Sequence, residues 1–199
     1  MISLRTYQHD LIRDIRAAFV SGLKSVCAVG PTGMGKSLCF AEIAKHAHGR
    51  NKKTCIVVHR DTLLRQAAEK LDAFKIPYGI IAAGYSGTRD TIQIASAQSL
   101  IRRLDIYEFD LLIFDEGHLS AADILAPIIN NNAFPVIGAT YPKEYKQLIE
   151  PQSDFANAFE MIRVNEISED ERVIAGEQRQ RNGAVGSKLA HRKHVLMIR

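Results

Sequence analysis

Short apolar runs alternate along the chain with segments in which apolar residues recur every three or four positions. Between residues 7 and 20, Leu11, Ile15 and Phe19 keep the spacing of one helix face, which predicts an amphipathic helix. Brief runs rich in valine and isoleucine are typical of buried strands. Further helices are predicted at residues 36–49 and 61–74, and strands at residues 25–30, 53–59, 91–96, 111–114 and 135–138.

This order of strands and helices predicts an α/β fold, with a mostly parallel sheet covered by helices on both faces. In such folds ligands bind beyond the carboxyl ends of the strands. The alternation fades after Pro142. We therefore expect one domain over residues 1–150 and a basic C-terminal extension over residues 151–199, which is either a solvated, partly disordered tail or the truncated start of a second lobe.

Composition narrows the function classes only a little. The formal charge is +4, which tolerates an anionic partner without requiring one. Cys27, Cys39 and Cys55 lie far apart in apolar surroundings, so we expect three reduced core residues and no metal site built from cysteines. The first residues lack the pattern of a signal peptide, and no apolar run is long enough to cross a membrane. We expect a cytoplasmic protein without a membrane partner.

The strongest local signal is the segment GPTGMGKS at residues 30–37, which matches GxxxxGK[ST] between a predicted strand and a predicted helix. Glycines let such a loop fold around phosphates, and the following helix adds its positive end. Lys36 is expected to reach the β and γ phosphates of ATP, and Ser37 to bind Mg²⁺. An ordinary glycine turn would not need the Lys-Ser pair. The expected nucleotide-binding residues in the loop are Pro31, Thr32, Gly33, Met34, Gly35, Lys36 and Ser37.

The run LLIF at residues 111–114 leads directly into Asp115 and Glu116. Nucleotide hydrolysis needs a second magnesium contact and a group that activates water, both placed at the end of a neighbouring strand. We expect Asp115 to bind Mg²⁺ and Glu116 to act as the base, so Lys36, Asp115 and Glu116 form the predicted catalytic set. An isolated acidic pair at a strand end would have no such meaning without the upstream loop.

Six segments occur in a characteristic order: LRTYQ at 4–8, GPTGMGKS, VVHRDTLLRQ at 57–66, IASAQSL at 94–100, DEGH at 115–118 and GATYP at 138–142. This series resembles the first RecA-like, P-loop ATPase lobe of superfamily 2 helicases of the DEAD/DEAH-box type. It is most similar to DNA-repair helicases and restriction-enzyme motor subunits. The resemblance covers about the first three quarters of the chain.

The resemblance implies further nucleotide contacts and a coupling path. Gln8 would read the adenine edge, with Arg5 stacked near the base, although the two could simply start a helix. His118 and Thr140 would couple the nucleotide site to the DNA-facing motif, whereas a lone histidine is often only structural. GATYP supplies one hydroxyl, Thr140, where the family has two.

The resemblance also implies contacts with the nucleic-acid backbone. Arg60 would bind phosphate, unless it is only an exposed arginine. Ser96, Gln98 and Ser99 would contact phosphates or sugars, and the alternative is that these residues cap a helix. DNA is expected rather than RNA, because the most similar families act on DNA.

The function expected from these observations is an ATP-hydrolysing lobe of a DNA helicase or translocase, with ATP and Mg²⁺ as cofactors. No segment after residue 150 resembles a second lobe or its arginine finger, so we expect that lobe to be absent from this chain. A second polypeptide could supply it, and turnover by this chain alone should be weak. The alternative is a switch module whose ATP binding toggles a nucleic-acid or partner contact without translocation. A small-molecule kinase would leave LRTYQ and IASAQSL unexplained.

Overall fold

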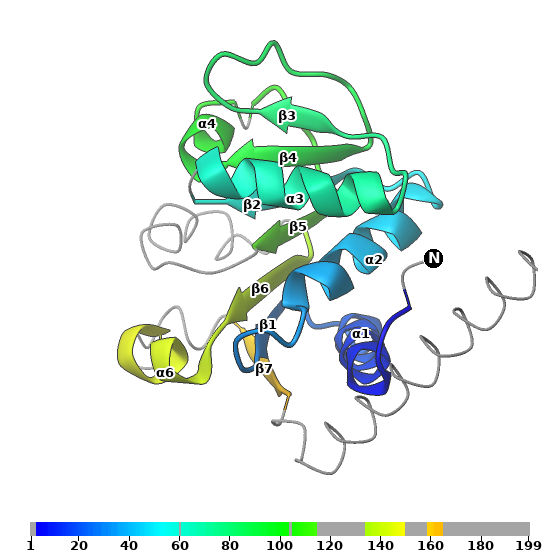
Figure 1. The fold of residues 1–199 in the computed structure, drawn as a ribbon, viewed down its shortest axis with the longest axis vertical. Helices are drawn as coiled ribbons and strands as arrows, with labels where there is room; N and C mark the ends of the chain where they lie inside the picture. Colours follow the sequence, from blue (N-terminus) through cyan, green and yellow to red (C-terminus); the bar gives the residue numbers. More distant parts are fainter. Residues whose placement is uncertain (1–2, 60, 104, 115–133, 150–158, 165–199) are drawn as a thin grey trace, which may run out of the picture. The chain divides into compact units, whose positions relative to one another are not determined.

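The computed structural model describes residues 3–59, 61–103, 105–114, 134–149 and 159–164. These residues contain one sheet in which every pair of neighbouring strands is parallel, in the order β3-β4-β2-β5-β6-β1-β7 (Figure 1). The α/β fold class predicted from the sequence is confirmed. The strands are β1 Ser25–Val29, β2 Thr54–Val58, β3 Gly79–Ile81, β4 Ile92–Ser96, β5 Leu111–Phe114, β6 Val136–Thr140 and β7 Glu160–Arg163.

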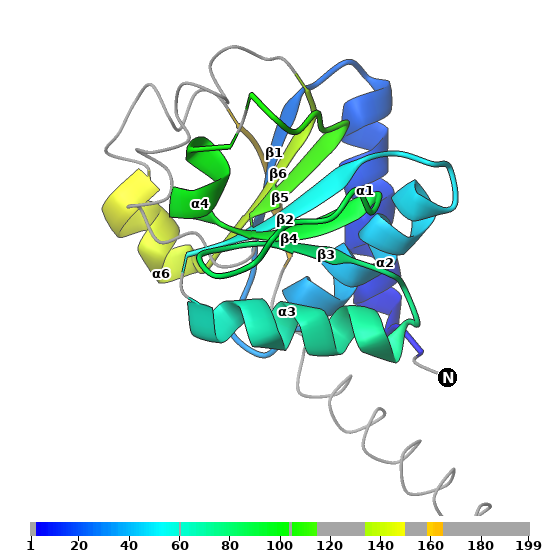
Figure 2. The same ribbon diagram turned by 90° about the horizontal axis from the view of Figure 1, so that it is seen from above.

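Helices cover both faces of this sheet (Figure 2). Helices α1 Thr6–Val20, α2 Lys36–His48 and α3 Asp61–Ala73 lie on one side. On the other side lie α4 Ala97–Ile101 and the segment formed by α6 Pro142–Glu144 and the π-helical turn Tyr145–Ile149. No described helix has the length and apolarity that crossing a membrane requires.

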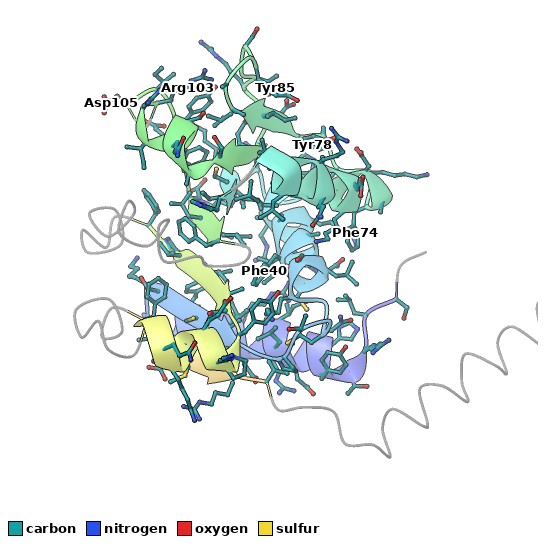
Figure 3. The ribbon with its side chains drawn as sticks, turned by 60° about the vertical axis from the view of Figure 1, so that its left-hand side comes forward. Phe40, Phe74, Tyr78, Tyr85, Arg103 and Asp105 are labelled. Carbon is teal, nitrogen blue, oxygen red and sulfur yellow. The ribbon has the colours of Figure 1, made fainter. Side chains whose placement is uncertain are left out.

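Alternation along the strands divides the core between the two faces. In β2, Ile56 and Val58 pack into the cluster under α1, α2 and α3, whereas Cys55 and Val57 pack into the cluster under α4. Phe40 of α2 fills the first cluster and is 1% exposed (Figure 3). Because both faces are covered, β1, β2, β4 and β5 are buried at every position and are mostly apolar, as expected for a parallel sheet. The three cysteines are buried in the core, as predicted.

Two strands were missed by the sequence patterns. Strand β3 has only three residues, and β7 is only partly buried at the sheet edge, so neither produces a clear apolar run. Strand β7 lies in the part of the chain that we assigned to the extension, yet it pairs with β1 from Val26 to Val29. The sheet therefore continues beyond residue 150.

Candidate functional site

The loop from Gly30 to Gly35 joins the end of β1 to the start of α2. Gly33 and Gly35 have φ angles of +79° and +82°, a region that favours glycine. At Gly30 a Cβ atom would collide with the Sδ atom of Met34. The backbone N–H of Gly30 donates to the carbonyl of Thr140 at 3.3 Å, which ties the loop to the end of β6. The sequence thus folds this segment into a tight turn of the kind that surrounds phosphates.

Lys36, the first residue of α2, is only 6% exposed. Its Nζ donates to the carbonyls of Gly30 at 2.8 Å and Pro31 at 3.2 Å. The same Nζ lies 4.0 Å from the centroid of the Tyr141 ring. A buried ammonium is costly unless other groups replace its hydration, and these two carbonyls and the ring do so here. The lysine predicted to bind phosphate is therefore held at the base of the loop.

Helix α1 holds the other end of the loop through the carbonyl of Met34. The Nε2 of Gln8 donates to this oxygen at 2.9 Å, and the hydroxyl of Tyr7 donates to it at 3.0 Å. The Oε1 of Gln8 accepts the backbone N–H of Arg5 at 2.9 Å, so both ends of the amide are used. Gln8 is 4% exposed, and a Cβ on Gly35 would lie 2.5 Å from its Nε2. Helix α1 therefore packs directly on the phosphate loop.

Gln8 and Arg5 make contacts in the structure that the sequence did not suggest. Gln8 binds the loop, and adenine recognition by Gln8 and Arg5 stays a prediction. Arg5 is exposed, and its Nη1 donates to the Tyr7 hydroxyl at 3.4 Å. We missed Tyr7 and Tyr141 as contributors to the site. Their positions inside LRTYQ and GATYP were the available signal.

Other predicted residues of the site lie near the same edge of the sheet. Ser37 is half-buried in the first turn of α2, and Thr32 is exposed in the loop. Thr140 ends β6 with 1% exposure, and its hydroxyl has no hydrogen-bond partner within the described residues. A buried hydroxyl without a partner is costly, so this group marks a place where a polar partner would be stabilising.

Four predicted residues lie outside the described residues: Arg60, Asp115, Glu116 and His118. Strand β5 ends at Phe114, and β5 lies between β2 and β6 in the sheet. Within the described part of the chain, no group of three or more His, Cys, Asp or Glu side chains could hold a metal ion. Of the two predicted magnesium ligands, only Ser37 can be placed.

A buried thiol, that of Cys27, lies next to Lys36. The neighbouring Cys27 thiol on β1 is buried, and burial raises its pKa to about 12, while the positive charge of Lys36 acts in the opposite direction. The thiol therefore stays neutral at ordinary pH and does not compensate the lysine charge. The carbonyls of Gly30 and Pro31 and the Tyr141 ring are among the groups that compensate it.

The residues predicted to contact nucleic acid sit at the carboxyl end of β4. Ser96 ends this strand and precedes α4, but its side chain makes no capping hydrogen bond. Gln98 is exposed and Ser99 is half-buried. The alternative interpretation was that these residues cap a helix. That helix is present as α4, but the Ser96 hydroxyl does not cap it.

The loop after β3 adds an exposed ring near this surface. Tyr85 is 51% exposed, and its carbonyl accepts a hydrogen bond from Nη1 of Arg103 at 3.5 Å (Figure 3). Arg103 follows α4, so this bond ties the β3 loop to the α4 segment. Tyr85 lies in a segment that none of the sequence motifs includes.

Solved structures similar to this chain are helicase cores. The UvsW helicase from bacteriophage T4 has a TM-score of 0.65 and 18% identity, covering 82% of this chain and 61% of UvsW. The Hef helicase domain from Pyrococcus furiosus has a TM-score of 0.65 and 19% identity, covering 84% of this chain and 39% of Hef. At these identities the likeness shows the fold. In both comparisons, this chain spans less than two thirds of the relative's length.

A third similar structure is the Sulfolobus solfataricus SWI2/SNF2 ATPase core in complex with dsDNA. Its TM-score is 0.59 and its identity 16%, covering 79% of this chain and 35% of that protein. A search of curated protein sequences gave no significant match.

The sequence of this chain also matches a protein family. Residues 1–175 match the family described as the type III restriction enzyme, res subunit. This match includes the phosphate loop and the whole described sheet. The resemblance predicted from the ordered motifs is confirmed. The chain belongs to the type III restriction enzyme res subunit family, and it has the RecA-like lobe of superfamily 2 helicases.

Proposed function

We propose that this chain binds ATP with Mg²⁺ and hydrolyses it as the first motor lobe of a DNA helicase or translocase. The observation that carries this proposal is the folded phosphate loop, with buried Lys36 held at its base by Gly30, which follows β1, and by Tyr141, which follows β6. Lys36 binds the β and γ phosphates, and the loop backbone surrounds them. When bound, Mg²⁺ neutralises charge on the phosphates, with Ser37 and Asp115 as its protein ligands.

Glu116 is the proposed base that takes a proton from the attacking water. Asp115 and Glu116 follow β5, the neighbour of β6, so the sheet order supports their place near the loop. Thr140, whose buried hydroxyl needs a partner, and His118 form the proposed coupling pair. A magnesium charge offsets the repulsion between two adjacent carboxylates.

The proposed nucleic-acid surface consists of Arg60, Ser96, Gln98 and Ser99. Its support is the position of Ser96 at the carboxyl end of β4, followed by the exposed Gln98. One similar structure is a complex with dsDNA, and another is a hypothetical ATP-dependent RNA helicase from Sulfolobus tokodaii. We favour DNA on the motif resemblance. Backbone contacts of this kind carry little sequence preference and weaken with salt.

We further propose that residues 1–150 form the ATP-binding part and residues 151–199 a basic extension, with β7 of that extension completing the sheet. In the motors that the motifs resemble, a second lobe supplies an arginine finger to the bound ATP, and a second polypeptide could supply that lobe here. Loss of such a finger usually slows phosphoryl transfer by about 10³- to 10⁵-fold, so turnover by this chain alone is expected to be slow.

The decisive experiment measures ATP turnover by the purified chain with no nucleic acid, single-stranded DNA, duplex DNA and RNA, at low and moderate salt. We expect slow turnover that DNA stimulates, and less stimulation at higher salt. Stimulation by RNA alone would overturn the preference for DNA. Absence of both ATP binding and turnover in every condition would overturn the proposal itself.

The second candidate is a switch module that binds ATP without translocation. It is favoured by the single hydroxyl, Thr140, in GATYP. Its signature is a change in DNA affinity on adding Mg-ATP, measured by fluorescence anisotropy, together with negligible turnover. DNA affinity that does not respond to ATP would contradict this second candidate.

A further inference from the structure

Tyr141 is brought to the phosphate loop by the register of two central strands. Strands β1 and β6 are parallel neighbours in the sheet (Figure 1). Their register places Val29 opposite Thr140. Tyr141 is the next residue after β6, and its backbone is extended with φ −97° and ψ 152°. Both strands therefore end together, and the first residue beyond β6 lies beside the first residues of the loop.

The ring of Tyr141 is in contact with the group expected to bind ATP. Its centroid is 4.0 Å from Nζ of Lys36, and the same Nζ donates to the carbonyls of Gly30 and Pro31. A cation over a desolvated ring is stabilised by about 0.5 to 2 kcal/mol, or about two- to thirtyfold in an equilibrium constant. The ring therefore contributes measurably to where the ammonium rests.

ATP cannot bind Lys36 without changing these contacts. An ammonium has three donors, and two of them serve the carbonyls of Gly30 and Pro31. Contact with both the β and γ phosphates needs two donors, so at least one carbonyl contact must be given up. The phosphates therefore compete for the ammonium with the groups that hold it now, and the ring is one of those groups.

We propose that Tyr141 is a positioning residue that holds Lys36 in its nucleotide-free conformation, so that ATP competes with the Tyr141 ring for the ammonium. This inference rests on the proposed function, because it assumes that the loop binds ATP. Nucleotide binding then releases the ring. The backbone carbonyl of Tyr141 accepts the N–H of Tyr145 at 2.8 Å, so Tyr141 lies at the start of the segment formed by α6 and the π-helical turn.

The test compares Tyr141→Leu, which removes the ring, with Tyr141→Phe, which keeps the ring and removes the hydroxyl. Binding of a non-hydrolysable ATP analogue with Mg²⁺ is measured by isothermal titration calorimetry on the full chain. Tyr141→Leu is expected to bind the analogue about two- to thirtyfold more tightly than the unsubstituted chain. Tyr141→Phe is expected to bind the analogue with the same affinity as the unsubstituted chain. A different affinity would mean that the hydroxyl has a role.

A second measurement does not depend on the leucine variant being folded. The chain has no tryptophan, so Tyr141→Trp places a single indole against Lys36. Its emission is expected to change when the analogue binds, because the ammonium leaves the ring. Unchanged emission at saturation would contradict the inference.

The outcomes separate this inference from the proposed function. Equal or weaker analogue binding by Tyr141→Leu, with normal binding by the unsubstituted chain, overturns the role of Tyr141 and leaves the ATP site intact. Failure of the unsubstituted chain to bind the analogue overturns both.

Discussion

The carboxyl edge of the sheet has two regions that are built in different ways. At the ends of β1 and β6, Lys36 and Gln8 are 6% and 4% exposed and are held by hydrogen bonds to the loop. At the ends of β3 and β4, Gln98 is exposed and Tyr85 is 51% exposed. The first region is held by hydrogen bonds within the chain, part of which Lys36 must exchange for phosphate contacts when ATP binds, whereas the second presents groups that are open to solvent.

This difference fits the two ligands that we propose. Phosphoryl transfer depends on donors that are already in place, because reorganising them during the reaction costs rate. A nucleic-acid backbone offers many similar phosphates, so several weak and adaptable contacts suffice. Substitutions in the first region should therefore have large and specific effects, and substitutions in the second should have small effects.

The largest effect is expected from Lys36→Ala. Two charge-assisted hydrogen bonds to phosphate would be lost, at about 1.5 to 3 kcal/mol each, so ATP affinity should fall by about 10²- to 10⁴-fold. Lys45→Ala is the matched control, because Lys45 lies on the same helix but is exposed and pairs with Glu42 at 3.3 Å. Calorimetry with an ATP analogue measures both. Similar affinities for the two variants would remove the proposed role of Lys36.

Glu116→Gln separates binding from chemistry. The amide cannot accept the water proton, so turnover should fall by about 10²- to 10⁴-fold while ATP affinity stays near normal. Turnover is followed by phosphate release and affinity by calorimetry. Normal turnover in this variant would show that another group is the base.

Smaller effects are expected in the loop backbone, where two glycines form an internal comparison. Gly33→Ala and Gly35→Ala both place a side chain at positive φ, which costs about 1 to 2 kcal/mol. Only the Cβ at Gly35 meets a neighbour, Nε2 of Gln8. Gly35→Ala should therefore lower the free energy of unfolding more than Gly33→Ala does, as measured by urea denaturation.

The double variant Gln8→Ala, Gly35→Ala tests the cause of that difference. Removing the Gln8 side chain opens the space, so adding Gly35→Ala to Gln8→Ala should cost no more than Gly33→Ala costs alone. An unchanged penalty would mean that the difference between the two glycines does not arise from packing against Gln8.

The sequence predicted the parts of this molecule that depend on local pattern. Buried runs gave β1, β2, β4, β5 and β6, and the loop motif lies where it was expected. The edge strands β3 and β7 were missed because three residues, or a half-buried run, leave little pattern. The contacts of Tyr7 with Met34 and of Tyr141 with Lys36 join segments far apart in sequence, and no local pattern encodes them.

The smallest effect is expected at the open surface. Gln98→Ala removes one neutral group that contacts backbone, so DNA affinity should fall by about two- to tenfold, the value of about one net hydrogen bond. Arg50→Ala is a demanding control, because it removes a positive charge from the loop between α2 and β2. This loop precedes β2 and so lies at the edge opposite the carboxyl edge of the sheet. Fluorescence anisotropy with labelled single-stranded DNA measures both. A greater loss in the Arg50 variant would place the nucleic acid at the other edge, and only a greater loss at Gln98 supports the separation of the two regions.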